Sequence, residues 1–272
     1  MMRQQVVGQR IFAALAALLS ASCIHLSAVR AQDAVGEGLE FPPRLPGGKT
    51  VVSHETAFFL QPPDNLLPDV KVATHPPRVD LLFYPGQDYV GNPWSNWGEG
   101  TATKGKYYSA IGDHLGLGGK RAENAERAGT ARVFEYDADK QTLRPLVDLQ
   151  ELLELPAGHY TPGKIHTSVD LGRDGWLYYA THRGAFSAST PAYHYRGDWL
   201  LRTQPETGKS EVIGQPVPGH CIPAGVLDSE RLIFYGGTRA GSLGRREKRP
   251  EDEQFFAYDL AARKVIFQGP KH

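Results

Sequence analysis

The chain has 272 residues and carries 30 basic and 30 acidic side chains, so its formal net charge is zero. Binding to nucleic acid needs a concentration of positive charge, and this balance therefore argues against a nucleic-acid partner. Thirty glycines and 20 prolines indicate many short strands and turns. Once an N-terminal signal is removed, Cys221 is the one cysteine left in the sequence, so stability must come from packing and not from a disulfide.

Residues 1–31 have the pattern of a secretory signal peptide. Arg3 and Arg10 precede the apolar run IFAALAALLSASCIHL, and cleavage is expected after Ala31. No stretch reaches the roughly 20 apolar residues that span a bilayer. We therefore expect an exported protein, secreted or periplasmic, without a transmembrane segment; acylation at Cys23 is the alternative. Residues 32–47 are expected to form an extended lead-in.

Three segments in the rest of the chain resemble one another. Each contains two apolar runs and then a pair of strands around a short polar turn, and the pattern returns after about 55 to 67 residues. This length suits the four-stranded blade of a β-propeller. We expect an all-β fold, an incomplete β-propeller of four-stranded antiparallel blades, with three clear blades at about residues 97–150, 164–218 and 219–270. Residues 48–96 are expected to add N-terminal strands, as a closing strand or a partial blade.

The apolar runs WLYYAT and LIFYGG are continuous and do not alternate with polar residues. A continuous apolar strand is typical of a sheet covered on both faces, as the stacked blades of a propeller are. The turns DADKQ, QPETGK and DLAARK are short and polar, as hairpin turns should be. An ordinary antiparallel sandwich of the same strands is the alternative. One short helix is expected within residues 146–155.

Polar and ionisable residues are predicted to gather on one face of the repeats. His166 starts the first strand of the central unit and His182 ends the second, so antiparallel pairing puts both on the same face. Long connections follow the second strand of each unit on that face, and long loops often carry function. Extending the comparison to the neighbouring units gives the predicted ligand-binding residues: Glu99, Asp113, His114, His166, His182, Arg183, His220 and Arg239.

Imidazoles that converge from neighbouring blades suit a divalent transition metal. His166, His182 and His220 are the predicted ligands, with Asp113 or Glu99 as an oxygen ligand, although their spacing matches no recognised metal motif. A histidine beside a carboxylate could instead serve as a general base. The remaining alternative is that the histidines cap strand ends and bond to backbone groups.

The phrases NPWSNWGEG, SAIGDH, GHYTPGKIH, DGWLYYATHRG, GHCIPAGVLD and RLIFYGGT resemble a family of secreted, largely uncharacterised bacterial proteins of planctomycete type. The repeats of that family are similar to YVTN and quinoprotein-dehydrogenase-like propellers. More distantly, one histidine per blade on one face resembles oligogalacturonate lyase, a propeller whose histidines hold a metal that assists removal of a proton beside a uronate carboxylate. On that analogy His166, His182 and His220 would be ligands or base, and Arg183 or Arg239 would face the substrate carboxylate.

Two functions follow from these patterns. The first is an exported propeller that acts as a binding or scaffold domain, with a polar rim that engages a small molecule, a polysaccharide or a protein partner. Trp94 and Trp97 could form a platform for a sugar ring, or pack between blades. The second is a metal-dependent lyase or hydrolase acting on an acidic polysaccharide. No cofactor is expected beyond a possible divalent metal.

Overall fold

The structure, a computed structural model, describes residues 46–85, 96–112, 130–183, 188–241 and 252–270. The predicted signal peptide and most of the predicted lead-in lie outside these residues. Within them the regular secondary structure is mostly β, in four antiparallel sheets, so the predicted all-β fold class is confirmed. The closing of the sheets around one axis stays a prediction. None of the described helices is both long enough and apolar enough to cross a membrane.

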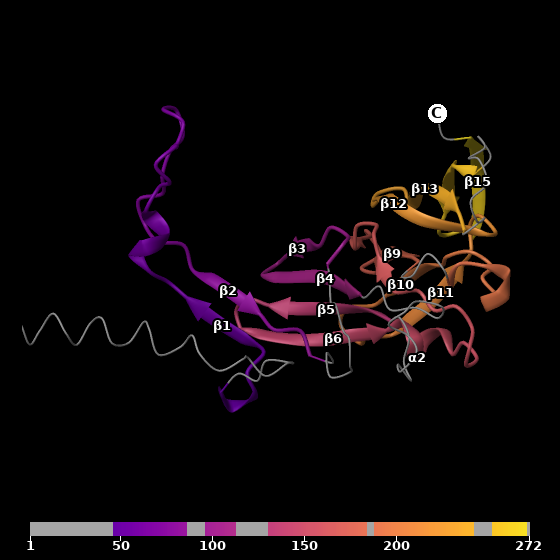
Figure 1. The fold of residues 1–272 in the computed structure, drawn as a ribbon, viewed down its shortest axis with the longest axis horizontal. Coiled ribbons are helices and arrows are strands. Elements are labelled where there is room, and N and C mark those ends of the chain that lie inside the picture. The colour runs from indigo at the N-terminus through magenta and orange to yellow at the C-terminus, as the bar shows by residue number, and fades with distance from the viewer. Residues whose placement is uncertain (1–45, 86–95, 113–129, 184–187, 242–251, 271–272) are drawn as a thin grey trace, which may run out of the picture. The chain divides into compact units, whose positions relative to one another are not determined.

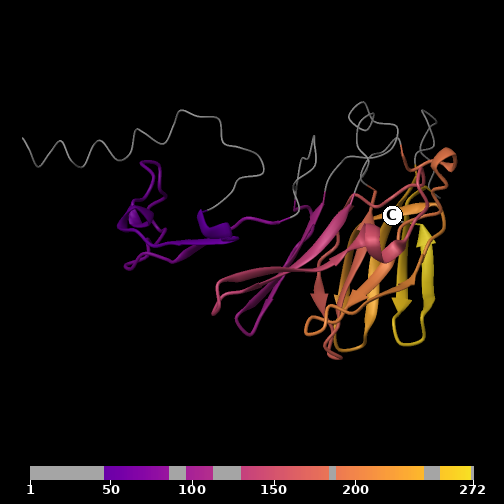
Figure 2. The same ribbon diagram turned by 90° about the horizontal axis from the view of Figure 1, so that it is seen from below.

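Each of the three large sheets pairs its strands in chain order. The first sheet has the order β3-β4-β5-β6 and the last sheet the order β12-β13-β14-β15. In the middle sheet β9, β10 and β11 follow one another, and β9 also pairs with the two short strands β7 and β8. Figure 1 shows the three sheets in succession along the chain, and Figure 2 shows them from below.

The strands of the first sheet are β3 (Thr101–Thr103), β4 (Lys106–Gly112), β5 (Ala131–Asp137) and β6 (Thr142–Asp148). Those of the middle sheet are β7 (Lys164–Ile165), β8 (Asp170–Leu171), β9 (Leu177–His182), β10 (Leu200–Thr203) and β11 (Ser210–Gly214). Those of the last sheet are β12 (His220–Asp228), β13 (Ile233–Ala240), β14 (Gln254–Asp259) and β15 (Lys264–Pro270).

The expected helix is present but shorter than its apolar pattern. Helix α2 covers Leu149–Leu153, and the Asp148 side chain caps it by accepting a hydrogen bond from the Gln150 N–H. Leu146 and Val147 instead belong to β6, where Val147 pairs with Val133 of β5. The first residues of the predicted helical run, Leu146 and Val147, therefore pair as part of a strand, and the helix begins only after them.

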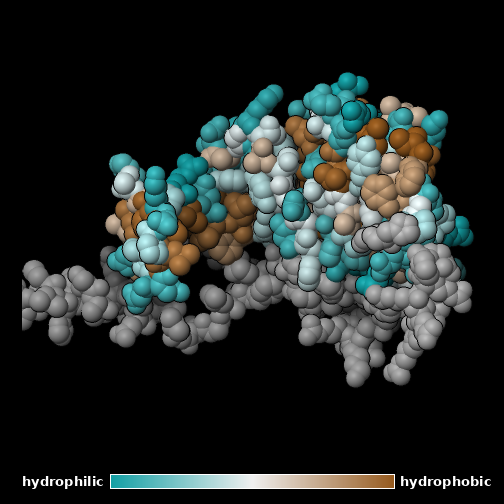
Figure 3. Space-filling view, turned by 90° about the horizontal axis from the view of Figure 1, so that it is seen from above, coloured by the Kyte–Doolittle hydropathy of each residue, from teal (hydrophilic) through white to brown (hydrophobic). Residues whose placement is uncertain are grey.

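The predicted N-terminal strands form a two-stranded ribbon of β1 (Val51–His54) and β2 (Val79–Leu82), preceded by η1 (Pro46–Gly48) and interrupted by η2 (Ala57–Leu60). This ribbon covers part of the first sheet, because Val51 packs in one cluster with Ile111 and Phe134. The Tyr136 hydroxyl donates a hydrogen bond to Asp80 at the same contact. Much apolar surface stays exposed here, including Phe58 and Leu67, and Figure 3 shows brown surface both over this part and over the large sheets.

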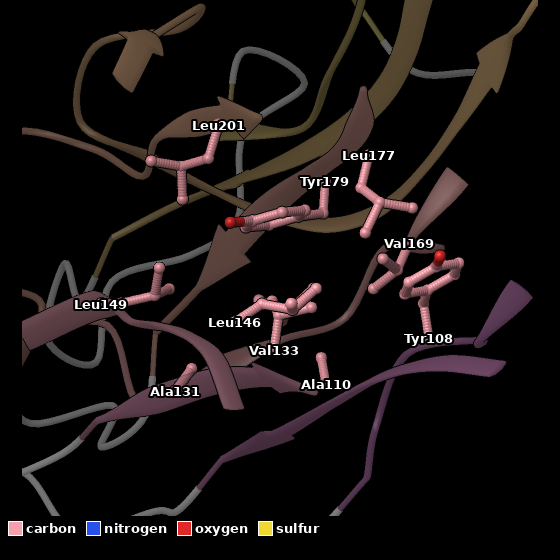
Figure 4. Close-up of a cluster of buried hydrophobic side chains, with 11 residues drawn as sticks. Tyr108, Ala110, Ala131, Val133, Leu146, Leu149, Val169, Leu177, Tyr179 and Leu201 are labelled. Atoms are coloured by element: carbon pink, nitrogen blue, oxygen red, sulfur yellow. The ribbon is translucent and has the colours of Figure 1, made fainter. Parts of the chain in front are cut away.

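The middle sheet is covered on both faces. Successive side chains of a strand point to opposite faces, and in β9 Leu177 and Tyr179 enter a cluster with the first sheet (Figure 4). Tyr178 and Ala180 enter a second cluster with the last sheet. Residues 177–180 are all almost fully buried. The continuous apolar run in the sequence is thus explained by a strand that has no solvent face.

Two glycines allow the backbones of the first and middle sheets to approach closely. A Cβ on Gly98 would lie 2.3 Å from the Thr167 carbonyl oxygen, and one on Gly112 would lie 2.2 Å from that of Gly163. Both distances are shorter than any side chain tolerates, and the neighbour is backbone that cannot rotate away. The glycines therefore set how near the first sheet comes to the middle sheet.

Replacing Leu201 by alanine should destabilise the fold by about 2–5 kcal/mol, because it leaves a cavity between the first and middle sheets. Leu201 of β10 is fully buried in that cluster. The matched control is Leu81→Ala, since Leu81 is half-exposed on β2 and should lose less than about 1 kcal/mol. Urea unfolding followed by tryptophan fluorescence measures both. Equal losses for the two variants would contradict the packing described here.

Candidate functional site

The segments that lead into, or form, the first strands of the three large sheets contact one another, and they are here called the leading segments. The Val169 N–H donates to the Glu99 carbonyl oxygen at 2.9 Å, which ties the start of the first sheet to the start of the middle sheet. The Ser168 N–H donates to the Gly225 carbonyl oxygen at 3.4 Å, and the Leu227 N–H donates to Oδ2 of Asp170 at 2.9 Å. The middle sheet is thus joined to the last sheet as well.

A hollow of ≈ 480 Å³, here called the inner groove, lies where these segments meet. One side of it is polar and the other is apolar and rich in glycine. The polar side comes from the first and middle sheets, and the apolar side comes from β12, β13 and β14 of the last sheet. Its side chains include Trp97, Glu99, His166 and Ser168 on the first side, and Val226, Tyr235 and Phe255 on the second.

Trp97 is held in place but remains half-exposed at the groove. Its ring stacks on His166 with centroids 5.3 Å apart and planes 12° from parallel. The Lys164 ammonium lies 4.5 Å from the centroid of the same ring, a cation–π geometry. Part of the ring surface is therefore used in packing, while 47% of the residue is still accessible.

Behind the groove lies a second feature, the buried polar cluster, formed by His182, Asp198 and Cys221. One potential ligand atom from each of these residues lies within 4.8 Å of the other two. Within the described ranges no other group of three or more His, Cys, Asp or Glu side chains meets that distance. This group could therefore hold a metal ion. His182 connects the cluster to the groove, because its ring meets that of His166 edge-on at 4.4 Å between centroids.

Asp198 is the hydrogen-bond acceptor at the centre of the cluster. Its Oδ1 accepts from the Tyr160 hydroxyl at 2.8 Å and from the Thr181 hydroxyl at 2.7 Å, and its Oδ2 accepts from the Tyr195 hydroxyl at 3.3 Å. Burial raises the pKa of this carboxyl to about 6, against the lowering effect of the three hydroxyl donors and of Arg183.

Burial also raises the pKa of the Cys221 thiol to about 12, and the charge of Asp198 adds to the rise. A thiol is a nucleophile only as thiolate, so Cys221 does not fit the role of a catalytic nucleophile by itself. A metal ion, in contrast, binds the thiolate and removes its proton. The arrangement is therefore better suited to metal binding than to thiol catalysis.

Two of the three predicted metal ligands lie together. Lys164 pairs with His182 and Ile165 with Thr181, which brings the neighbouring His166 onto the His182 ring. His220 is not in the group, and its Nδ1 lies 2.9 Å from the Pro218 carbonyl oxygen, as in the alternative that histidines bond to backbone. Adjacent residues of a strand point to opposite sides, so when His220 points away from His182 and Asp198, its neighbour Cys221 points toward them.

Of the other predicted ligand-binding residues, some lie at the inner groove or near the buried polar cluster and some do not. Glu99 lines the inner groove. Arg183 is half-buried, with Nη1 3.4 Å from the Ala240 carbonyl oxygen, and it is close enough to affect the pKa of Asp198 and Cys221. Arg239 is exposed and pairs with Cys221 across β12 and β13. Asp113 and His114 lie outside the described residues.

Sequence reasoning did not find Asp198. It follows a long connection, and no motif relates it to His182 or Cys221. A weak signal was present in the run YHYRGDW, where a carboxylate stands between aromatic residues just before an apolar strand. Such a carboxylate is buried only if hydroxyl groups reach it, and those hydroxyls come in part from Tyr160 and Thr181, elsewhere in the chain.

A further hollow of ≈ 560 Å³ lies at the outer strands, beside β6 and α2. Its charged residues Arg132 and Asp148 form an ion pair with each other at 2.6 Å between Nε and Oδ2. Asp148 also caps α2. These groups are engaged in holding β6 and the helix, so this hollow has no convergent set of groups for chemistry.

Comparison with known proteins adds little to this geometry. No protein-family model and no curated protein sequence matches the chain. A solved structure that resembles it is that of a Bacteroides ovatus protein described as a candidate hydrolase, with 12% sequence identity and a TM-score of 0.34 over 65% of this chain and 45% of that one. The chain thus spans less than half the length of that protein. A likeness at this level supports no conclusion about fold or function.

Replacing Thr181 by valine should cost about 1–3 kcal/mol of stability, because the Thr181 hydroxyl is fully buried and serves two partners. It donates to Asp198 and accepts from the Trp199 N–H at 3.0 Å, so valine leaves a backbone donor without its acceptor. Thr142→Val, at an exposed position of β6, is the matched control and should be near neutral. Chemical denaturation of both variants measures the difference.

The buried ammonium of Lys164 should make the free energy of unfolding depend on pH. Burial, assisted by Arg183, lowers the pKa of its ammonium from 10.5 to about 8 in the folded protein. Between pH 8 and 10.5 the unfolded chain therefore binds more protons here than the folded chain, so stability rises with pH in this window. The stability of the wild type relative to Lys164→Met should increase by up to about 3 kcal/mol across it.

The control for this experiment is Lys264→Met, at an exposed position of β15. Its profile supplies the baseline for replacing a lysine by methionine at an exposed position. Thermal or urea unfolding at half-unit pH intervals supplies the data. A flat profile for Lys164→Met would mean that the ammonium stays charged in the folded protein.

Proposed function

We propose that the chain is an exported β-propeller domain that binds a ligand in the inner groove. Three features support the propeller. The large sheets are antiparallel and pair their strands in chain order, neighbouring sheets share apolar clusters, and their leading segments meet. The blades of a propeller surround a central channel, and the inner groove lies where the leading segments of the three sheets meet. This fold is also the one implied by the resemblance to secreted bacterial proteins of planctomycete type.

The observation that carries the proposal is the two-sided character of the groove. Glu99 and Ser168 offer hydrogen-bonding groups on one side, while Tyr235 and Phe255 offer aromatic surface on the other. Their rings stand 6.2 Å apart and 17° from parallel, so they form a broad apolar surface. A sugar ring has an apolar face and a rim of hydroxyls, and it matches such a pair of walls.

The charge of the groove restricts which kind of sugar could bind. Glu99 is exposed at the groove, and it acts on Asp170 nearby. Burial raises the pKa of Asp170 against a hydrogen bond from the Leu227 N–H, and the negative charge of Glu99 adds to the rise. The Glu99 carboxylate in the groove repels a uronate and favours a neutral or an amino sugar. We therefore infer a neutral or amino-sugar oligosaccharide as the ligand class.

The alternative function is a metal-dependent lyase or hydrolase that acts on an acidic polysaccharide. The contact between His166, which lines the groove, and His182, which belongs to the buried polar cluster, favours it. A metal bound to His182 in the cluster would then be separated from the groove by the ring of His166. Arg183 or Arg239 would have to receive the substrate carboxylate, yet neither is among the residues that line the groove.

Calorimetric titration with three hexasaccharides tests the proposal. The probes are cellohexaose, hexa-glucosamine and hexagalacturonate, which are neutral, basic and acidic. We expect binding of one of the first two, and a loss of at least tenfold in affinity on Glu99→Gln or Trp97→Ala. The loss corresponds to about 1.5 kcal/mol or more for a charge-assisted hydrogen bond or a stacking contact.

The matched control is Glu206→Gln, because Glu206 is exposed in the hairpin between β10 and β11. It should leave affinity unchanged. Binding of hexagalacturonate alone, with release of an unsaturated product, would overturn the proposed ligand class in favour of the alternative. Binding that Glu99→Gln and Glu206→Gln affect equally would show that the ligand does not occupy the groove.

A further inference from the structure

The buried polar cluster joins two sheets. His182 ends β9 and Asp198 lies just before β10, both in the middle sheet, while Cys221 lies in β12 of the last sheet. The exposed fractions of the three residues are 7%, 0% and 0%. The backbone is tied at the same place, since the Asp198 N–H donates to the His220 carbonyl oxygen at 2.9 Å. Three side chains able to bind a metal thus converge from two neighbouring sheets in a buried place.

The spacing of the ligand atoms is close to that of an occupied site. Zinc binds imidazole nitrogen and carboxylate oxygen at about 2.0–2.2 Å and thiolate sulfur at about 2.3 Å in a tetrahedron, which separates its ligand atoms by about 3.3–3.8 Å. The three atoms here lie within 4.8 Å of one another. Shifts of about an ångström or less bring them onto a common ion, and changes in side-chain torsion supply shifts of that size.

The donor set selects among metals. Calcium and magnesium take oxygen ligands from carboxylates, carbonyls and water. One thiolate, one imidazole and one carboxylate, in contrast, are the three ligand types of protein zinc sites. A thiol and a carboxyl group side by side, both fully buried, supply the negative charge that a divalent cation requires.

The surroundings hold one ligand in a fixed orientation. Hydroxyls of Tyr160, Thr181 and Tyr195 all donate to the Asp198 carboxylate. Such outer hydrogen bonds orient metal ligands and are a regular part of metal sites. Since the three donors leave other lone pairs of the two oxygens available, the carboxylate can still bind an ion. Thr181 precedes His182 in the same strand, so the orientation of Asp198 is coupled to the position of the histidine.

We propose that His182, Asp198 and Cys221 bind one zinc ion, which ties the last sheet to the middle sheet. None of the three residues lines the inner groove, and all are buried, so the ion has a structural role. The proposal is independent of the ligand that the groove binds. A fourth position on the ion is left for water or another group.

Metal content of the purified full chain tests the proposal. The protein is prepared without a histidine tag, dialysed against zinc chloride and passed over a chelating resin that removes loosely held ions. We expect one zinc per chain by mass spectrometry for the wild type and for His220→Ala, a control that removes a histidine next to Cys221 but outside the group. Cys221→Ala and His182→Ala should each lose at least tenfold in zinc affinity. The melting temperature of the wild type should fall on addition of dipicolinic acid, and that of Cys221→Ala should not.

Cobalt substitution of the wild type keeps the test decisive if the variants fail to fold. Co²⁺ bound by Cys221 should give a thiolate-to-cobalt charge-transfer band in the near ultraviolet, and addition of zinc should abolish it. A wild-type protein that retains no zinc and shows no such band overturns the proposal. Zinc retained equally by the wild type and by a folded Cys221→Ala variant overturns it as well, because the ion would then lie elsewhere.

Discussion

Burial of both faces of the middle sheet is the constraint on which the rest of the structure depends. In β9 the side chains of Leu177 and Tyr179 fill the contact with the first sheet, and those of Tyr178 and Ala180 fill the contact with the last sheet. Burying a leucine side chain contributes about 1.5–3 kcal/mol, and a tyrosine ring buries about 150–250 Å² of surface. A strand with two such faces cannot remain at the surface, so a sheet must pack on either side of it. The face of the last sheet that points away from the middle sheet is also apolar among the described residues, with Val226 and Phe267 more than half-exposed, and Val226, Tyr235 and Phe255 on this face form the apolar side of the inner groove.

The two functional features follow from this packing. When sheets pack face to face with their strands roughly in line, their leading segments come together at one edge, and the end of an inner strand of one sheet lies near the start of the first strand of the next. The first arrangement creates the inner groove between Glu99, His166 and Val226. The second brings the end of β9 against the start of β12, where His182 meets Cys221. Both features therefore use positions that belong to different sheets, and neither exists within one sheet alone.

The inner groove and the buried polar cluster differ in the charge and exposure of their polar groups. The groove has the exposed carboxyl group of Glu99 on one side and aromatic rings on the other, and this contrast is the basis of the proposed recognition of an uncharged or basic sugar. The buried polar cluster keeps a carboxylate and a thiol away from water, with three hydroxyl donors on the carboxylate, which suits a bound cation. His166, which lines the groove, and His182, which belongs to the cluster, connect the two features by one edge-on ring contact.

Much of the secondary structure was determined by local sequence. The continuous run WLYYAT predicted a strand covered on both faces, the short polar turns predicted the hairpins, and antiparallel pairing predicted that His166 and His182 lie on the same face, where the structure brings their rings into contact. The place of Cys221 and Asp198 was decided only by tertiary structure. Adjacent strand residues such as His220 and Cys221 point to opposite sides, and which of them faces the cluster depends on the sheet that packs against it. A carboxylate such as Asp198 is buried only where hydroxyls from distant segments reach it, and no local pattern encodes that meeting.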